Sequence, residues 1–466
     1  MTSIRILLAG AVLCIAAAAT AQDTRVVPAE QSQLLLSYSA VVKRAAPAVV
    51  NVYSARVNRS RPAITADPFF QRFFGGAQQG PRVEQSLGSG VIVTADGLIV
   101  TNNHVVKGAD QILVALADRR EYPAKLVFAD ERLDLALLRI EAKALPTVPL
   151  GDSDRAEVGD VVLAIGDPFG VGQTVTHGIV SAVARTGQGV ANYQYFLQTD
   201  AAINPGNSGG ALLDMGGRLL GINTAIASPS GGSTGVGFAI PANMVRVFLA
   251  AAKTGKLVTA WIGAEGEALT SVSAAQLGLD RAGGVLVTAV TPGSPSAAAG
   301  IAVGDILTAV DGKEVVDLGQ LRYRIATQGV GTRVEVDLRR AGQQRKVALT
   351  LAAPPELPAR SLTRITGENL LNGVTIGNLS PAFAQEVGAG LPESGVVVFE
   401  ILGTAPAARL GFLKPGDLVE AVNGVPVRTV AEAVAAAKTG VPSLRFNRAG
   451  RRTTCSAVQG QLRCAV

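Results

Sequence analysis

The sequence is poor in aromatic residues and in histidine. Aromatic residues make up 4% of the 466 residues, and glycine occurs 53 times, which favours many short strands joined by tight turns. No block of basic residues is interleaved with aromatic residues, so a nucleic-acid-binding role has little support. Neither a metal-ligand spacing nor a phosphate-binding loop is present, and we expect no metal and no other cofactor. The two histidines, His104 and His177, keep the search for a catalytic base short.

Long apolar runs are also scarce, and the one strongly apolar segment lies at the N-terminus. Arg5 precedes the apolar run Ile6–Ala19, and the small residues Ala19–Ala21 follow, which is the layout of a secretory signal peptide cut before Gln22. The run is shorter than the roughly 20 apolar residues that span a bilayer. We therefore expect a soluble, exported protein, and removal of residues 1–21 lowers its formal charge from +6 to +5. The alternative is a membrane-anchored protein that keeps this segment.

Cysteine is rare too, and Cys455 and Cys464 remain once the signal peptide is removed. They lie symmetrically about Gln459-Gly460. If that dipeptide is a two-residue hairpin turn, the two cysteines face each other at a distance that permits a disulfide. An oxidising compartment allows the bond. The alternative is two free cysteines near the C-terminus.

Short β-branched runs separated by glycine extend from about residue 46 to residue 240, and they favour an all-β barrel or sandwich. A helix is expected at 243–254. A polar loop at 54–86 contains four phenylalanines within Phe69–Phe74, on one face of a possible helix. They can pack on the parent domain, but we favour an intermolecular contact.

The region beyond residue 255 is internally duplicated. Gly284–Val287 and Val310–Lys313 belong to one unit, and Gly395–Val398 and Val422–Val425 repeat the pattern in a second. A repeat this long indicates two duplicated domains rather than a solenoid. The proline-rich segment Ala353–Pro358 marks the linker between them.

Ser208 lies in the glycine-rich stretch Gly206-Asn207-Ser208-Gly209-Gly210. Glycine lets the backbone approach a substrate carbonyl, so the N–H groups of Gly206 and Ser208 can converge on one oxygen. His104 follows an apolar strand, and Asp134 opens another. The order His, Asp, Ser is that of chymotrypsin, so we predict His104 as the base, Asp134 as its orienting acid and Ser208 as the nucleophile. Asp130 and Asp152 compete for the acid role, but neither opens an apolar strand.

Five stretches carry a resemblance to a known family: 86–93, Thr101–Val106, Asp134–Ala136, Gln198–Gly210 and Gly237–Pro241. With them the chain resembles the HtrA serine proteases of the periplasmic Do, DegP and DegQ type. The resemblance implies a mainly β fold, in which a chymotrypsin-like double β-barrel protease domain is followed by two PDZ domains. The expected boundaries are a signal peptide at 1–21, the protease domain at 22–256 with its insertion at 54–86, the first PDZ domain at 257–353, a linker at 354–366 and a PDZ-like domain at 367–466.

The resemblance also implies site residues. The oxyanion hole falls at Gly206, Asn207 and Ser208. The carboxylate-binding loop of the first PDZ domain falls at Trp261, Ile262, Gly263, Ala264 and Glu265. In the second PDZ-like domain, 372–376 stands at the same place without a recognisable loop signature, which leaves its ligand binding open.

Substrate preference follows from the residues around Ser208. Ala202 stands where a trypsin-like pocket needs an acid, so a pocket specific for arginine or lysine is not expected. A small apolar pocket is predicted instead, formed by Ile203, Thr224, Ala225, Ile226, Ala227 and Ser228. We therefore expect cleavage after valine, isoleucine, alanine or threonine. Asn207 replaces the acid that pairs with a new N-terminus in trypsin-like enzymes. The resemblance implies control by loop ordering instead, with Arg185 in a sensor loop at 184–189 as the relay.

The leading hypothesis is a periplasmic serine endoprotease of protein quality control. It would cleave unfolded proteins that its PDZ domains tether, and it would assemble from trimers. The alternative is a chaperone or peptide-binding scaffold with little protease activity.

Overall fold

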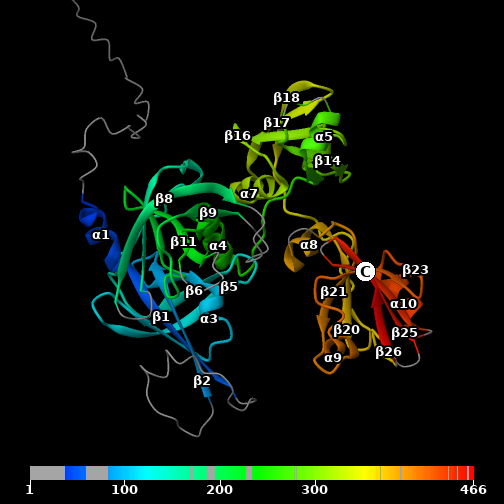
Figure 1. The fold of residues 1–466 in the computed structure, drawn as a ribbon, viewed down its shortest axis with the longest axis horizontal. Coiled ribbons are helices and arrows are strands. Elements are labelled where there is room, and N and C mark those ends of the chain that lie inside the picture. The colour runs from blue at the N-terminus through cyan, green and yellow to red at the C-terminus, as the bar shows by residue number, and fades with distance from the viewer. Residues whose placement is uncertain are drawn as a thin grey trace, which may run out of the picture. The chain divides into compact units, whose positions relative to one another are not determined.

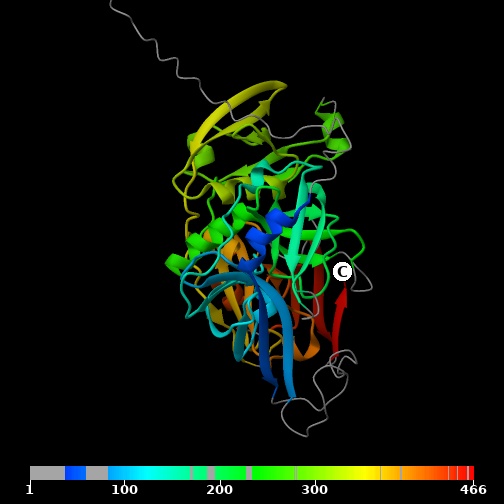
Figure 2. The ribbon, with the colours of Figure 1, turned by 90° about the vertical axis from the view of Figure 1, so that its left-hand side faces the viewer.

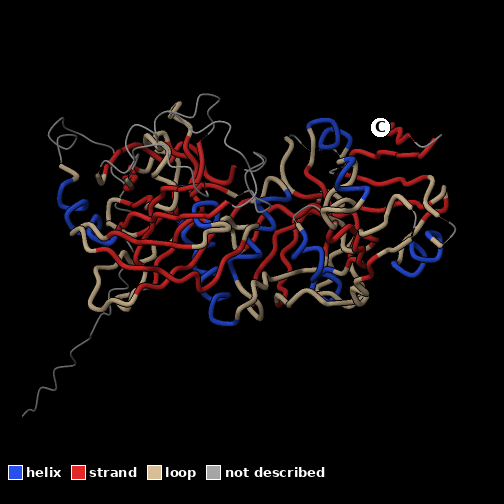
Figure 3. Tube along the Cα trace, turned by 90° about the horizontal axis from the view of Figure 1, so that it is seen from below, coloured by secondary structure: helices blue, strands red, loops and turns tan. Residues whose placement is uncertain are grey.

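The computed structural model describes residues 37–58, 82–167, 172–185, 195–226, 233–277, 279, 281–367, 369–388, 391–438, 440–448, 450–458 and 461–465. The signal peptide, the Phe69–Phe74 segment, Ala227 and Ser228 lie outside these ranges, so the predictions made for them stay predictions, as does the trimer. Strands dominate the described chain (Figure 3). Within the described ranges, no helix combines the length and the apolar character needed to cross a membrane.

Two closed six-stranded barrels form the N-terminal region, coloured blue to green in Figure 1. The first has the strand order β1-β2-β3-β6-β5-β4, with β1 Val49–Asn58, β2 Arg82–Ile92, β3 Leu98–Asn102, β4 Gln111–Ala115, β5 Glu121–Asp130 and β6 Leu135–Ile140. The second has the order β10-β11-β12-β9-β8-β7, with β7 Val161–Gly166, β8 Thr174–Arg185, β9 Phe196–Thr199, β10 Ala211–Asp214, β11 Leu219–Ile226 and β12 Gly237–Pro241. The predicted double β-barrel is confirmed.

Among the residues that the structure describes, the helices that accompany the barrels are α1 Ser39–Ala45, η2 Ala46–Ala48, α3 Asn103–Val106, η3 Ser153–Arg155 and α4 Ala242–Thr254. Helix α4 directly follows the last strand of the second barrel, yet it packs on the first. Its fully buried Phe248 lies 5.3 Å, between ring centroids, from Phe128 of β5. It ends at Gly255, whose φ of 71° is the left-handed conformation that glycine adopts without strain. The helix therefore joins the two barrels.

The insertion predicted at 54–86 is shorter than expected. Strands β1 and β2 stay paired from Val49 opposite Val91 to Asn58 opposite Arg82. They run side by side as a long hairpin, drawn in blue in Figure 2. The residues at both ends of the predicted loop are therefore strand, because backbone pairing continues beyond the barrel wall.

Two further sheets follow, one for each duplicated unit. The first unit contains β13 Ala264–Ala268, α5 Ser271–Gln276, β14 Val285–Val290, α6 Pro295–Ala298, β15 Ile306–Val310, β16 Lys313–Glu314, α7 Leu318–Gln328, β17 Arg333–Arg340 and β18 Gln343–Thr350. The second contains β19 Thr363–Arg364, β20 Val374–Leu379, α8 Pro381–Val387, β21 Gly395–Ile401, α9 Pro406–Leu410, β22 Leu418–Val422, β23 Val425–Pro426, α10 Val430–Ala437, β24 Ser443–Arg448, β25 Arg451–Val458 and β26 Gln461–Ala465. Each unit has its own buried apolar core.

The duplication extends to a buried carboxylate in each unit that binds an arginine. Asp305 is 1% exposed and accepts hydrogen bonds from the Arg340 guanidinium, whose Nε lies 2.6 Å from Oδ1. Asp417 is likewise 1% exposed and pairs with Arg448, with Nε 2.7 Å from Oδ1. The two carboxylates therefore anchor the strand that carries their arginine in each unit.

The second unit starts earlier than its sequence indicates, and a disulfide links the last two strands at its end. Within the predicted linker 354–366, β19 pairs with β20 and so belongs to the second sheet. At the other end, β25 and β26 pair with Cys455 opposite Cys464, and a disulfide joins these residues across a Cα–Cα distance of 4.0 Å. Gln459 and Gly460, the predicted turn residues, lie outside the described ranges.

Candidate active site

The loop that carries Ser208 is wedged between the two barrels. A Cβ on Gly209, which has a φ of +86°, would lie 2.0 Å from the carbonyl oxygen of Ser89 in β2. A Cβ on Gly210 would lie 2.3 Å from the carbonyl oxygen of Ile165 in β7. Both positions therefore require glycine, because any side chain would push the serine loop away from one barrel.

Ser89 fixes the direction of the loop's backbone. Its N–H donates to the Ser208 carbonyl at 2.8 Å, and its Oγ donates to the Gly206 carbonyl at 2.7 Å. Gly206 has a φ of +101°, and the Asn207 N–H donates to Asn204 O at 3.0 Å. Of the three residues predicted for the oxyanion hole, Asn207 therefore already uses its backbone N–H in a hydrogen bond within the protein. Among the described residues, the N–H groups of Gly206 and Ser208 have no acceptor.

His104 and Asp134 lie close together, as predicted. The Nδ1 atom of His104 lies 2.7 Å from Asp134 Oδ2, and the His104 backbone N–H donates to Oδ1 at 2.9 Å. Asp134 is 6% exposed and adopts a φ of +53° just before β6. Its carbonyl accepts hydrogen bonds from Asn103 N, at 3.1 Å, and Asn102 Nδ2, at 2.9 Å. The end of β3 and the start of α3 therefore hold both His104 and Asp134 in place.

Thr224 connects this pair to Ser208. Its Oγ1 donates to Asp134 Oδ2 at 2.8 Å, and its carbonyl accepts the hydroxyl proton of Ser208 at 3.1 Å. Asn102 Nδ2 donates to the same Thr224 hydroxyl at 3.2 Å. We predicted Thr224 only as a pocket residue, and the orienting roles of Thr224, Asn102 and Ser89 were missed. One signal was available, since Asn223-Thr224 is a polar pair within the otherwise apolar strand β11.

The competing acids are engaged elsewhere. Asp130 binds the guanidinium of Arg132, with its Oδ2 2.5 Å from Nη2. Asp152 accepts hydrogen bonds from Asn243 Nδ2, at 2.9 Å, and from Asp154 N, at 3.1 Å. Within the described ranges, no group of three or more His, Cys, Asp and Glu side chains is placed to hold a metal ion.

The predicted substrate pocket is described only in part. Ile203 is 1% exposed within the core of the second barrel. A Cβ on Gly237 would lie 2.7 Å from its Cδ1, so this glycine leaves room for the isoleucine. The side chains of Ala225 and Ile226 lie outside the described set, as does the side chain of the predicted relay, Arg185.

The predicted PDZ loop lies beside an open strand edge in the first unit. The Trp261 backbone pairs with Ala352, and Gly263, with a φ of +74°, accepts a hydrogen bond from Thr291 N at 2.9 Å. Ala264 and Glu265 begin β13, which is the terminal strand of its sheet. A cavity of about 350 Å³ lies between this strand and α7. A peptide that adds a strand requires such a groove.

In the second unit the corresponding edge is covered. Strand β20 pairs with β19, the backbone N–H of its Asn378 donates to the Arg360 carbonyl at 2.6 Å, and the Asn378 Oδ1 accepts the Val430 N–H at 2.7 Å. Its own linker thus occupies the edge that an added peptide strand would use.

The opposite face of α7 contacts the protease barrels. Tyr323 is 1% exposed and stacks on Tyr195, with ring centroids 3.5 Å apart and planes at 3°. Its hydroxyl donates to Asp154 Oδ1 at 3.1 Å, and Arg324 Nη1 lies 2.8 Å from the same oxygen. Burial raises the pKa of Tyr195 to about 12.

Comparisons with known proteins agree with this architecture. The trypsin-like peptidase domain matches residues 88–222, and a PDZ domain matches residues 262–351 and again residues 404–446. A relative named "Probable periplasmic serine endoprotease DegP-like", from Marinomonas sp. (strain MWYL1), is 40% identical over 429 residues, which cover 88% of this chain and 90% of the relative. The periplasmic serine endoprotease DegP of Escherichia coli (strain K12) is 41% identical over 371 residues, covering 79% and 75%.

A solved structure, of the HtrA-type protease AlgW with a decapeptide, is 45% identical and covers 69% of this chain and 99% of its own, with a TM-score of 0.50. The likeness to the relatives above extends over most of their length as well as most of this chain. On these grounds the protein belongs to the HtrA family of serine endoproteases, with a trypsin-like protease domain followed by two PDZ domains.

Proposed function

We propose that Ser208 is the nucleophile of peptide-bond hydrolysis, that His104 is its general base and that Asp134 orients the imidazole. The observation that carries the proposal is the 2.7 Å contact between His104 Nδ1 and Asp134 Oδ2, which leaves Nε2 to take the serine proton. The Ser208 hydroxyl now donates to Thr224 O. Rotation about its Cα–Cβ bond turns it towards His104 when substrate binds. His104 then returns the proton to the leaving amine.

The N–H groups of Gly206 and Ser208 form the oxyanion hole. Ser89 supports this assignment, because its hydrogen bonds to the carbonyls of both residues keep those carbonyls on the side of β2. Two preorganised donors stabilise the charge that develops on the substrate oxygen. Asn207 holds the turn before Ser208 in shape, since its backbone N–H donates to the Asn204 carbonyl.

The substrates we propose are unfolded periplasmic proteins, cleaved after small aliphatic residues. Ile203, held against Gly237, supports a shallow apolar pocket. The terminal strand β13 and the cavity beside it support a peptide-binding role for the first PDZ groove, and the structure of the similar protease AlgW is named with a decapeptide.

We also propose that this groove regulates the protease through α7. Leu321, Arg322 and Ile325 line the groove, whereas Tyr323 and Arg324 contact Tyr195 and Asp154 of the protease. Tyr195 lies shortly after the predicted sensor loop at 184–189 in the sequence. When a ligand shifts α7, this movement is passed through Tyr195 to the segment around Arg185, our predicted relay.

Digestion of unfolded casein by the wild type and by Ser208→Ala tests the catalytic assignment. We expect the variant to lose activity by several orders of magnitude while keeping the thermal melting of the wild type. Mass spectrometry of the fragments should place most cleavages after valine, isoleucine, alanine or threonine. Equal digestion by both proteins would refute the nucleophile, and cleavage after lysine or arginine would refute the pocket.

A further inference from the structure

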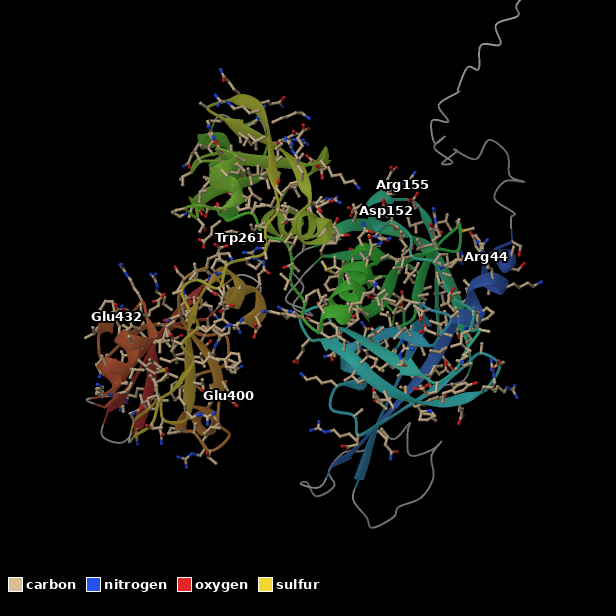
Figure 4. The ribbon with its side chains drawn as sticks, turned by 180° about the vertical axis from the view of Figure 1, so that it is seen from behind. Arg44, Asp152, Arg155, Trp261, Glu400 and Glu432 are labelled. Carbon is tan, nitrogen blue, oxygen red and sulfur yellow. A yellow bond between two sulfur atoms is a disulfide. The ribbon has the colours of Figure 1, made fainter. Side chains whose placement is uncertain are left out.

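A carboxylate of the second PDZ domain is bound at the groove of the first. The Glu393 Oε1 atom accepts a hydrogen bond from the Trp261 indole N–H at 2.5 Å, and Oε2 accepts one from the Thr291 hydroxyl at 3.0 Å. The Glu393 backbone N–H donates to Oε1 of Glu265, on β13, at 3.1 Å. Three polar contacts thus tie one residue to the predicted carboxylate loop, its neighbour Thr291 and the peptide-binding strand. Trp261, which belongs to the first PDZ domain, is labelled in Figure 4.

The neighbours of Glu393 close the same cavity. Its walls come from the loop at 259–263, from β13 and from α7 in the first domain, and from residues Pro381, Ala384, Gln385, Gly388, Leu391 and Pro392 in the second. The Thr259 hydroxyl also donates to Gln385 Oε1 at 2.8 Å. The end of α8 and the segment after it therefore cover the groove into which a peptide would add.

We propose that Leu391–Glu393 is a built-in ligand of the first PDZ groove, which an incoming peptide must displace. The inference rests on the proposed peptide-binding function of that groove. A segment tethered in the same chain has an effective concentration of roughly millimolar order. Docking that would be weak between separate molecules therefore keeps the groove occupied. Because the second domain's own binding edge is covered by β19, that domain acts here as a ligand and not as a receptor.

The charges around Glu393 suit this role. Arg322 on α7 attracts the carboxylate, whereas Glu265 repels it. Burial is the largest influence and raises the pKa of Glu393 above its ordinary value of 4.5, with Glu265 acting in the same direction and with Trp261, Thr291 and Arg322 opposing it. Because this pKa is raised in the docked state, docking weakens when the carboxyl group ionises, and a competing peptide can then displace the segment.

Trp261 is the only tryptophan in the sequence, so its fluorescence reports on the docking contact in the full-length protein. In the Ser208→Ala background, Glu393→Ala should shift its emission to longer wavelength and increase quenching by acrylamide, since the indole loses its partner and becomes hydrated. Thr291→Val removes one donor without altering the second domain and should act in the same direction. Glu393→Gln keeps an acceptor for the indole and should act less. Glu400→Ala, an exposed position on β21, is the matched control and should leave the emission unchanged.

The same proteins are titrated with a fluorescein-labelled decapeptide that has an apolar last residue and a free carboxylate. Removal of the built-in ligand should tighten peptide binding about tenfold in Glu393→Ala, because a larger fraction of the protein has an open groove. Identical emission and identical peptide affinity for Glu393→Ala and its parent would overturn the docking and leave the peptide site intact.

Two further outcomes are decisive. If the emission shifts but no variant binds the decapeptide, the docking stands and the peptide function proposed for the groove fails. If the Trp261 emission of the parent changes on dilution from micromolar to nanomolar protein, the contact forms between two copies, and the intramolecular docking is overturned.

Discussion

Thr224 offers a quantitative test of how the active site is oriented. Thr224→Val keeps the shape of the side chain but removes the hydroxyl that donates to Asp134 at 2.8 Å and accepts from Asn102 at 3.2 Å. A hydrogen bond to a charged group contributes about 1.5–3 kcal/mol. The loss of transition-state stabilisation should therefore lower kcat by roughly ten- to a hundredfold. KM should stay close to the wild-type value, because the hydroxyl faces the acid.

The assay is steady-state hydrolysis of a chromogenic peptide with valine before the scissile bond, with kcat and KM determined separately. Thr199→Val is the matched control, since Thr199 is fully buried in the same barrel and its hydroxyl accepts only the Ala201 N–H at 3.1 Å among the described residues. A rise in KM with unchanged kcat would refute the orienting role and restore Thr224 to the pocket. An unchanged kcat and KM would refute both roles.

Three other changes should give measurable results. Tyr323→Leu removes the stack on Tyr195, which contributes about 0.5–1.5 kcal/mol, so peptide-stimulated casein cleavage should fall several-fold at unchanged peptide affinity; unchanged stimulation would exclude this route. Asp305→Asn and Asp417→Asn each replace a buried carboxylate that binds a partly exposed arginine, Arg340 or Arg448, and calorimetry should show a transition lowered by several degrees in the PDZ domain that carries the change; lowering of the same transition in both variants would contradict the separate pairing in each domain. The pKa of Glu393 is raised in the docked state, so docking is strongest at a pH below the ordinary glutamate pKa of 4.5 and weakens as the pH rises through the docked pKa. Tryptophan emission should follow this titration in the wild type but not in Glu393→Gln. An identical pH dependence of the emission in both proteins would contradict the prediction.

The fold was predictable because its signals are local. Short β-branched runs between glycines indicate an all-β barrel or sandwich, the resemblance to the HtrA proteases implies the double barrel, and the duplicated pattern indicates two further domains. The spacing of the cysteines predicted that Cys455 lies opposite Cys464 in a hairpin, and the structure contains this pairing. The predicted linker at 354–366 is too long because it includes β19. This strand has only two residues, Thr363 and Arg364, and a strand of that length leaves no periodic pattern in the sequence.

The candidate site was predictable where the chemistry determines the residue type. Serine between glycines, a histidine after a strand and an aspartate before one all serve as sequence signals. The partners of these residues come from distant strands: Ser89 lies 117 residues before Gly206, and Thr224 lies 90 residues after Asp134. Serine is common, so nothing local marks Ser89, and the polar pair Asn223-Thr224 in an apolar strand is the one local signal for Thr224. Glu393 follows a proline in an ordinary turn, and only the folded chain brings it to Trp261, 132 residues away.

The central claim is that Ser208 is a nucleophile activated by His104. Diisopropyl fluorophosphate tests it directly, because the serine oxygen attacks phosphorus, fluoride leaves and one diisopropylphosphoryl group stays on the protein. The wild type should gain one such group, located on Ser208 by peptide mapping, and His104→Ala should react far more slowly. A wild type that stays unmodified, or one modified at another residue while Ser208→Ala labels equally fast, would contradict the account.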